Sequence, residues 1–143
     1  MEPIHVTKTF LPPFEEYCAL LRRIWETHVV TNDGPLYRQF EEDLRRYTGL
    51  EHLACVGNGM LALHIALRAL GLSDCDVITT PFTHVGTSDS LVWERCNPVF
   101  VDIDPDTLNL DPRRIEARIT DRTRAILAVH VYSNPCHIEA IND

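Results

Sequence analysis

The turn Gly57-Asn58-Gly59 is the part of the sequence whose residue types point most clearly to chemistry. It follows a short apolar segment and precedes a segment rich in Leu and Ala, so we expect it to join a strand to the start of a helix. Free backbone N–H groups and the positive end of the helix dipole converge at such a point. Glycine also lets another group approach the backbone closely. The turn therefore predicts a phosphate-binding site, and a plain strand-to-helix connection is the alternative.

A nicotinamide dinucleotide is one phosphate-bearing ligand to consider. Residues 57–62 match G-x-G-x-x-G/A, the fingerprint of dinucleotide-binding domains. That fingerprint also requires an acidic residue at the end of the next strand, about 20 residues further on. Here the next predicted strand ends at Thr80, whereas Asp74 and Asp76 lie at its start. This ligand is therefore the less favoured one.

Other potential ligands and nucleophiles lack the spacing that their chemistry requires. Asp102, Asp104 and Asp106 imitate the start of a calcium loop, but Thr107 and Arg113 stand where that loop needs glycine and glutamate. The histidines show no H-E-x-x-H spacing, and the sequence contains no G-x-S-x-G elbow. The five cysteines form no C-x-x-C pair, which favours small buried side chains in a reducing compartment over a zinc or redox motif.

Two amphipathic helices are expected before residue 50. Apolar residues recur every three or four positions over residues 14–28 and again over residues 36–47. The Pro12-Pro13 pair suits the start of the first helix, and Gly49 suits the end of the second. Residues 1–50 are therefore predicted to form an N-terminal helical segment.

From residue 51 onward, the pattern alternates between strands and helices. Strands are predicted at residues 52–56, 76–80, 98–103 and 124–131, and helices at residues 60–70, 85–94, 111–119 and from 135 on. Strands that are apolar throughout indicate a parallel sheet covered by helices on both faces. Ligands bind beyond the carboxyl ends of such strands, where residues 57–59, 80–84, 102–104 and 130–134 are expected to lie. The last helix has barely begun at residue 143, so the fold is expected to be truncated.

Composition excludes several classes of protein. The chain of 143 residues is 45% hydrophobic and 24% charged, which is typical of a globular domain with a core. Its net charge of −8 argues against nucleic acid as a partner. No apolar run approaches about 18 residues, which argues against a membrane span. The N-terminus lacks a basic region followed by an apolar one, so we expect a cytoplasmic protein.

A series of short motifs runs in order along nearly the whole chain. Residues 32–35 with 40–41 resemble G-P-x-x-x-x-F-E, residues 58–63 resemble S/N-G-T-x-A-L, and residues 76–83 resemble D/E-V-I-x-x-P-x-T. Residues 98–104, 109–111 and 120–130 match P-V-F-x-D-I-D, N-x-D and T-x-x-T-x-A-I-x-x-V-H. Together they resemble the DegT/StrS family of sugar-nucleotide aminotransferases. Residues 130–136 are most similar to members that act on dTDP-4-keto-6-deoxyhexoses.

The resemblance implies the large domain of a type I aminotransferase, with three αβα layers and pyridoxal 5'-phosphate as cofactor. Asn58 and the backbone at Gly59 and Met60 would bind the cofactor phosphate, and His84 would stack on the pyridine ring. Such enzymes transfer an amino group from glutamate to a nucleotide-linked keto-deoxy sugar, in polysaccharide or O-antigen sugar biosynthesis. They work as homodimers.

The chain departs from the family pattern at three positions. Met60 stands where the family has threonine, so a hydroxyl donor to the phosphate is lost. His84 stands where Phe, Tyr or Trp is usual, and imidazole covers less area in a stack. Ser133 stands where glycine is common. Each difference is expected to weaken cofactor binding.

The residues that perform the chemistry in the family are missing. Pyridoxal chemistry needs a Schiff-base lysine and a carboxylate on the pyridinium nitrogen, and both lie downstream of residue 143 in the family. Lys8, the only lysine here, is expected to be a solvated surface residue. We therefore assign no catalytic residue and expect the chain alone to be inactive and to self-associate through an exposed sheet edge. The alternatives are a non-catalytic module that binds a phosphate ligand or pairs with another subunit, and a small nicotinamide-binding domain.

Overall fold

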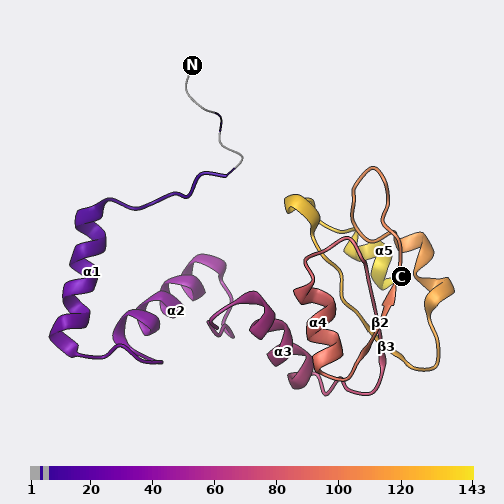
Figure 1. Ribbon diagram of the computed structural model, residues 1–143, viewed down its shortest axis with the longest axis horizontal. Helices are drawn as coiled ribbons and strands as arrows, with labels where there is room; N and C mark the ends of the chain where they lie inside the picture. The colour runs from indigo at the N-terminus through magenta and orange to yellow at the C-terminus, as the bar shows by residue number, and fades with distance from the viewer. Residues whose placement is uncertain (1–3, 5–6) are drawn as a thin grey trace. The chain divides into compact units, whose positions relative to one another are not determined.

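The computed structural model describes residue 4 and residues 7–143 (Figure 1). The chain divides into two compact units, Met1–Cys55 and Val56–Asp143. Over the described residues, no helix combines the length and apolar character needed to cross a membrane.

The first unit contains two helices, α1 (Phe14–Thr27) and α2 (Pro35–Thr48). Both were predicted from the apolar periodicity. α2 begins with proline, which has no N–H to lose at that position, and ends at Gly49 with a left-handed φ of 70°.

The strand predicted at residues 52–56 is wrong, because the structure describes this segment as irregular. The Tyr37 hydroxyl donates to the carbonyl of Cys55 at 2.9 Å, and the Arg45 guanidinium donates to the carbonyl of Leu53 at 3.1 Å. Side chains of α2 thus donate hydrogen bonds to backbone carbonyls that would otherwise accept the N–H groups of a neighbouring strand. A short apolar segment becomes a strand only where a partner strand lies beside it.

The second unit is built on a three-stranded parallel sheet in the order β2-β1-β3. The central strand, β1 (Asp76–Thr79), is buried along its whole length, including its polar residues Asp76 and Thr79. The flanking strands are β2 (Asn97–Phe100) and β3 (Thr123–Ile126). All three were predicted, although β2 and β3 are shorter than expected.

Helices of the second unit follow the prediction at two places and depart from it at a third. α3 (Gly59–Ala69) and α4 (Gly86–Trp93) occur where expected. The helix predicted at residues 111–119 is instead two 3-10 turns, η1 (Pro112–Arg114) and η2 (Glu116–Arg118). Asp111 caps η1 as predicted, but its carboxylate also binds the side chains of Arg113 and Arg114 and ties them back to the start of the turn. The chain then continues through η3 (Val131–Ser133) to α5 (Ile138–Asn142).

Hydrophobic clusters lie on both faces of the sheet. Val77 packs with Leu67 of α3 and Leu91 of α4 on one face. The next residue, Ile78, points to the opposite face, where its cluster contains Leu110 and Ile115, with Ile141 of α5 packed against it. The sheet therefore has helical layers on both sides, as the predicted αβα architecture requires.

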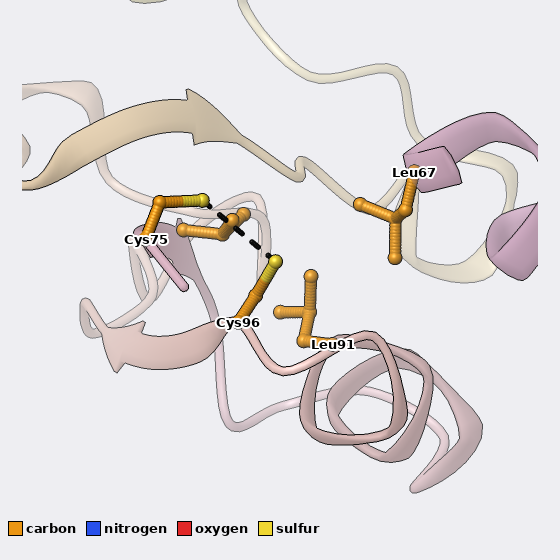
Figure 2. Close-up of a cluster of buried hydrophobic side chains, with 5 residues drawn as sticks. Leu67, Cys75, Leu91 and Cys96 are labelled. Carbon is orange, nitrogen blue, oxygen red and sulfur yellow. Dashed lines mark hydrogen bonds between the residues drawn. The ribbon is translucent and has the colours of Figure 1, made fainter. Parts of the chain in front are cut away.

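Two cysteines belong to the first of these clusters (Figure 2). The sulfur atoms of Cys75 and Cys96 lie 3.8 Å apart and are both buried. Burial, with the hydrogen bond to Cys75, raises the pKa of Cys96 to about 11. The Cys96 thiol therefore stays neutral at ordinary pH. Both buried cysteines act as small apolar core residues, as the sequence predicts.

Candidate functional site

A pocket of about 400 Å³ opens at the carboxyl ends of β1 and β3. Residues 81–84, which follow β1, form one side of it, and residues 129–132, which follow β3, form the other. From β1 the chain leads first to β2 on one side and later to β3 on the other, so the strand order reverses between β1 and β3. Open α/β sheets bind ligands at such a switch point, which makes this pocket the candidate site.

His84 lies in the pocket wall, and its ring is held by the start of α4. The ring nitrogen Nδ1 accepts the N–H of Gly86 at 3.0 Å. In the neutral ring the proton is then on Nε2, because Nδ1 uses its lone pair as the acceptor. The exposed imidazole is thus fixed at one edge and is free to stack on a planar group.

Met60 and His84 come together at Gly86, the first residue of α4. A Cβ atom at Gly86 would lie 3.1 Å from His84 Nδ1 and 3.5 Å from Met60 Sδ. A side chain at Gly86 would therefore require the His84 ring to shift by a few tenths of an ångström. The structure thus brings two of the predicted site residues to one place, although 24 positions separate them in the sequence (60 and 84).

The turn before α3 presents open backbone, as a phosphate site requires. The Asn58 side chain accepts the N–H of Leu61 at 2.9 Å and so caps the helix. In the described chain, the N–H groups of Gly59 and Met60 have no acceptor. A Cβ atom at Gly57 or Gly59 would meet nothing within 4 Å, and neither residue has a positive φ. Neither packing nor conformation within this chain demands these glycines, and the backbone here is open to another group.

Two aromatic residues of the pocket were missed in the sequence analysis. Phe82 and Tyr132 lie edge to face, with ring centroids 6.4 Å apart and planes at 75°. They join the loop after β1 to the loop after β3. The sequence does place an aromatic residue shortly after each of two predicted parallel strands. Because the carboxyl ends of parallel strands meet at one edge of the sheet, this pattern could have indicated the contact.

The backbone of the loop after β3 is one that favours glycine at position 133. Ser133 has a left-handed φ of 64°, as does its neighbour Tyr132 with 51°. Glycine adopts this conformation at little cost, whereas a residue with a Cβ atom does not. The glycine that is common at position 133 therefore suits the backbone that this chain adopts with serine.

Glu94 and Asp104, two acidic groups outside the pocket, have structural partners. Glu94 is buried and binds Arg68 at 2.6 Å and His64 at 3.1 Å, so His64 is a packed residue of the α3–α4 contact, as predicted. The Asp104 carboxylate accepts two backbone N–H groups of its own turn and binds Arg113. This segment is therefore an acidic turn and not a calcium loop. No group of three His, Cys, Asp or Glu side chains among the described residues could hold a metal ion. Lys8 lies exposed in the segment before α1.

Solved structures of aminotransferases are similar to this chain. It superposes on DesI, crystallised in the presence of its TDP-sugar product, with a TM-score of 0.84 and 35% identity over 91% of this chain and 33% of DesI. NtdA from Bacillus subtilis, with bound cofactor PMP, gives a TM-score of 0.85 and 32% identity over 90% of this chain and 29% of NtdA. The predicted aminotransferase-type α/β fold is confirmed.

Known sequences give the same relationship. The dTDP-4-amino-4,6-dideoxy-D-glucose transaminases of Shigella dysenteriae and Escherichia coli are 49% and 44% identical to this chain over 142 and 138 residues. These matches cover 99% and 96% of this chain but 38% and 37% of the relatives, so the chain spans little more than a third of their length. The sequence profile of the DegT/DnrJ/EryC1/StrS aminotransferases matches residues 14–143, and the chain therefore belongs to this family.

Proposed function

We propose that this chain is the N-terminal part of an aminotransferase that uses pyridoxal 5'-phosphate to move an amino group from glutamate to a nucleotide-linked keto-deoxy sugar. Residues 51–143 would supply the first part of the cofactor-binding domain, and residues 1–50 the helical segment before it. The observation that carries this proposal is the open turn before α3, where two N–H groups have no acceptor among the described residues. The Met60 side chain of this turn meets the His84 ring at Gly86. The transaminase relatives support the choice of reaction and of sugar.

The residues at the turn fit a phosphate group. The N–H groups of Gly59 and Met60 would donate to its oxygens at the positive end of α3, and Asn58 holds the turn in place. Met60 contributes only its N–H, because a thioether is not a donor. His84 would stack on the cofactor ring. Pyridoxal phosphate, when bound, supplies the electron sink for transfer of the amino group.

We assign no catalytic residue to this chain. The cofactor is held covalently by a lysine in such chemistry, and Lys8, in the segment before α1, is the only lysine present. The chain by itself is therefore proposed to bind the cofactor non-covalently and not to transaminate. We further propose that the protein forms homodimers and works in the cytoplasm; its five free cysteines favour a reducing compartment.

Removing one donor from the turn tests this proposal. Proline suits the first position of a helix, and Asn58 before it already has the extended backbone that proline requires, so Gly59→Pro is expected to fold. It eliminates one N–H that would bind the phosphate, which is expected to raise the Kd for pyridoxal 5'-phosphate about tenfold or more. Binding is measured by difference absorbance with the 143-residue chain.

Two controls sharpen this experiment. Gly59→Ala keeps the N–H group and separates the loss of a donor from the addition of a Cβ atom. Ala69→Ser changes the far end of the same helix and is expected to leave the Kd unchanged. Equal affinity in Gly59→Pro and the parent chain would contradict the proposed site, and binding of NADH without binding of pyridoxal phosphate would favour the nicotinamide alternative.

A further inference from the structure

Asn109 is a buried polar residue that the proposed function does not yet use. It is only 2% exposed and lies after the acidic turn of residues 102–108. Its carbonyl accepts the N–H of Asp104 at 2.9 Å, and the neighbouring Leu110 forms an antiparallel bridge with Ile103. The backbone on which the Asn109 side chain stands is therefore firmly held.

The side chain of Asn109 binds both ends of the loop that follows β3. Its Oδ1 atom accepts the N–H of Val131 at 2.9 Å. Its Nδ2 atom donates to the carbonyls of Asn134 and Pro135 at 3.0 and 3.1 Å. Three hydrogen bonds thus join residues 131 and 134–135 to one amide group.

Between these two ends, the loop adopts an unfavourable conformation. Tyr132 and Ser133 have φ values of 51° and 64°, a region in which a Cβ atom crowds the backbone. Two such residues in succession persist only where surrounding contacts hold them. The bonds from Asn109 flank this pair directly, and Asn134 adds a bond from its own amide to the carbonyl of Thr107.

The conformation of this loop determines one side of the pocket. It brings the Tyr132 ring against the Phe82 ring. Phe82 belongs to the loop that carries His84, which forms the other side of the pocket. We infer that Asn109 is a positioning residue, which holds residues 131–135 in this left-handed form and so sets the shape of the pocket between β1 and β3. The effect on ligand binding rests on the proposed function, whereas the effect on the loop does not.

Asn109→Asp tests the inference with little change in size. The variant keeps an oxygen that accepts the N–H of Val131. It replaces the Nδ2 donor by an oxygen, which cannot bind the carbonyls of Asn134 and Pro135. In NMR spectra of the 143-residue chain, we expect the nuclear Overhauser contact between the Tyr132 and Phe82 rings to be lost. The Kd for pyridoxal 5'-phosphate is expected to rise about tenfold, since both hydrogen bonds donated by Nδ2 are lost and two carbonyls lose their donor.

Two further variants separate positioning from general stability. Asn97→Ala removes another asparagine, whose amide donates to Asp76 at the far end of the sheet, and is expected to lower the unfolding temperature without changing the ring contact or the Kd. Adding Ser133→Gly to Asn109→Asp is expected to restore part of the ring contact, because glycine adopts positive φ without the help of Asn109. A mere loss of stability would not be repaired at this position.

The outcomes decide the inference separately from the proposed function. Retention of the ring contact in Asn109→Asp, or its loss in Asn97→Ala, would overturn the inference. If the parent chain does not bind pyridoxal phosphate, the proposed function fails, and the ring contact still decides the role of Asn109. If Asn109→Asp does not fold, hydrogen exchange in the parent chain decides it: slow exchange of the Val131 amide supports the inference, and rapid exchange overturns it.

Discussion

Met60 shows how a single side chain can alter a site whose backbone is intact. It occupies the second position of α3, where its N–H group has no acceptor in the part of the chain that the structure describes. Its sulfur lies near Gly86. The family pattern has threonine here, which would place a hydroxyl beside the same N–H group. The chain thus retains the backbone donor and lacks the side-chain donor.

Met60→Thr is therefore expected to strengthen phosphate binding. An added hydrogen bond contributes about 0.5–1.5 kcal/mol, so the Kd for pyridoxal 5'-phosphate should fall roughly three- to tenfold in an absorbance titration. Leu61→Thr is the matched control, because it adds the same hydroxyl one residue later, where the N–H already binds Asn58. An unchanged Kd in Met60→Thr would argue against phosphate at this turn.

At the scale of elements, one buried carboxylate joins the two helices that carry the site. Glu94, which directly follows α4, binds Arg68 and His64 of α3. The hydrogen bond from Arg68, more than that from His64, lowers the pKa of Glu94 despite its burial. These bonds fix α3 against α4 and so keep the turn before α3 beside the start of α4.

The depressed pKa of Glu94 gives a stability that depends on pH. Its unfolded pKa is about 4.3, so the stabilisation is complete above that pH and is lost as the pH falls through the lower folded value. The difference in free energy of unfolding between the parent chain and Glu94→Gln should therefore shrink from pH 6 to pH 3 in urea titrations. Glu116→Gln, at an exposed position, is the control. A difference that stays constant over this range would contradict the assignment.

At the scale of the whole molecule, the sheet and its helices leave apolar surface exposed. Both β2 and β3 are edge strands of the described sheet. Ile65 of α3 and Trp93 of α4 are 50% and 77% exposed. Unpaired strand edges and exposed apolar side chains favour association between chains.

We therefore expect the 143-residue chain to self-associate. In sedimentation velocity, its mass should rise above 16.3 kDa as the concentration increases. Ile65→Lys should reduce the association, because it places a charge within the exposed face of α3, whereas Glu116→Lys should not. A constant mass of one chain at all concentrations would count against this expectation.

Local sequence determined most of the secondary structure and one part of the site. Apolar periodicity, proline and glycine predicted α1 to α4, and Asn58 was correctly placed ahead of α3, because these signals act within a few residues along the chain. The predictions of a strand at residues 52–56 and of a single helix at residues 111–119 were wrong, because these signals do not include the side-chain contacts that the folded chain makes. In the first segment, Tyr37 and Arg45 of α2 bind the carbonyls that a strand would use. In the second, Asp111 binds the side chains of Arg113 and Arg114 within the turn itself.

Only the tertiary structure decided which residues share the pocket. Phe82 and Tyr132 are 50 positions apart, and Asn109 binds carbonyls 25 and 26 residues further along. No local pattern encodes such pairs, because they depend on the order β2-β1-β3, which places the ends of β1 and β3 next to each other. The amino-acid sequence specified the turn before α3 and its capping residue Asn58, and the sheet order determined which loops line the pocket.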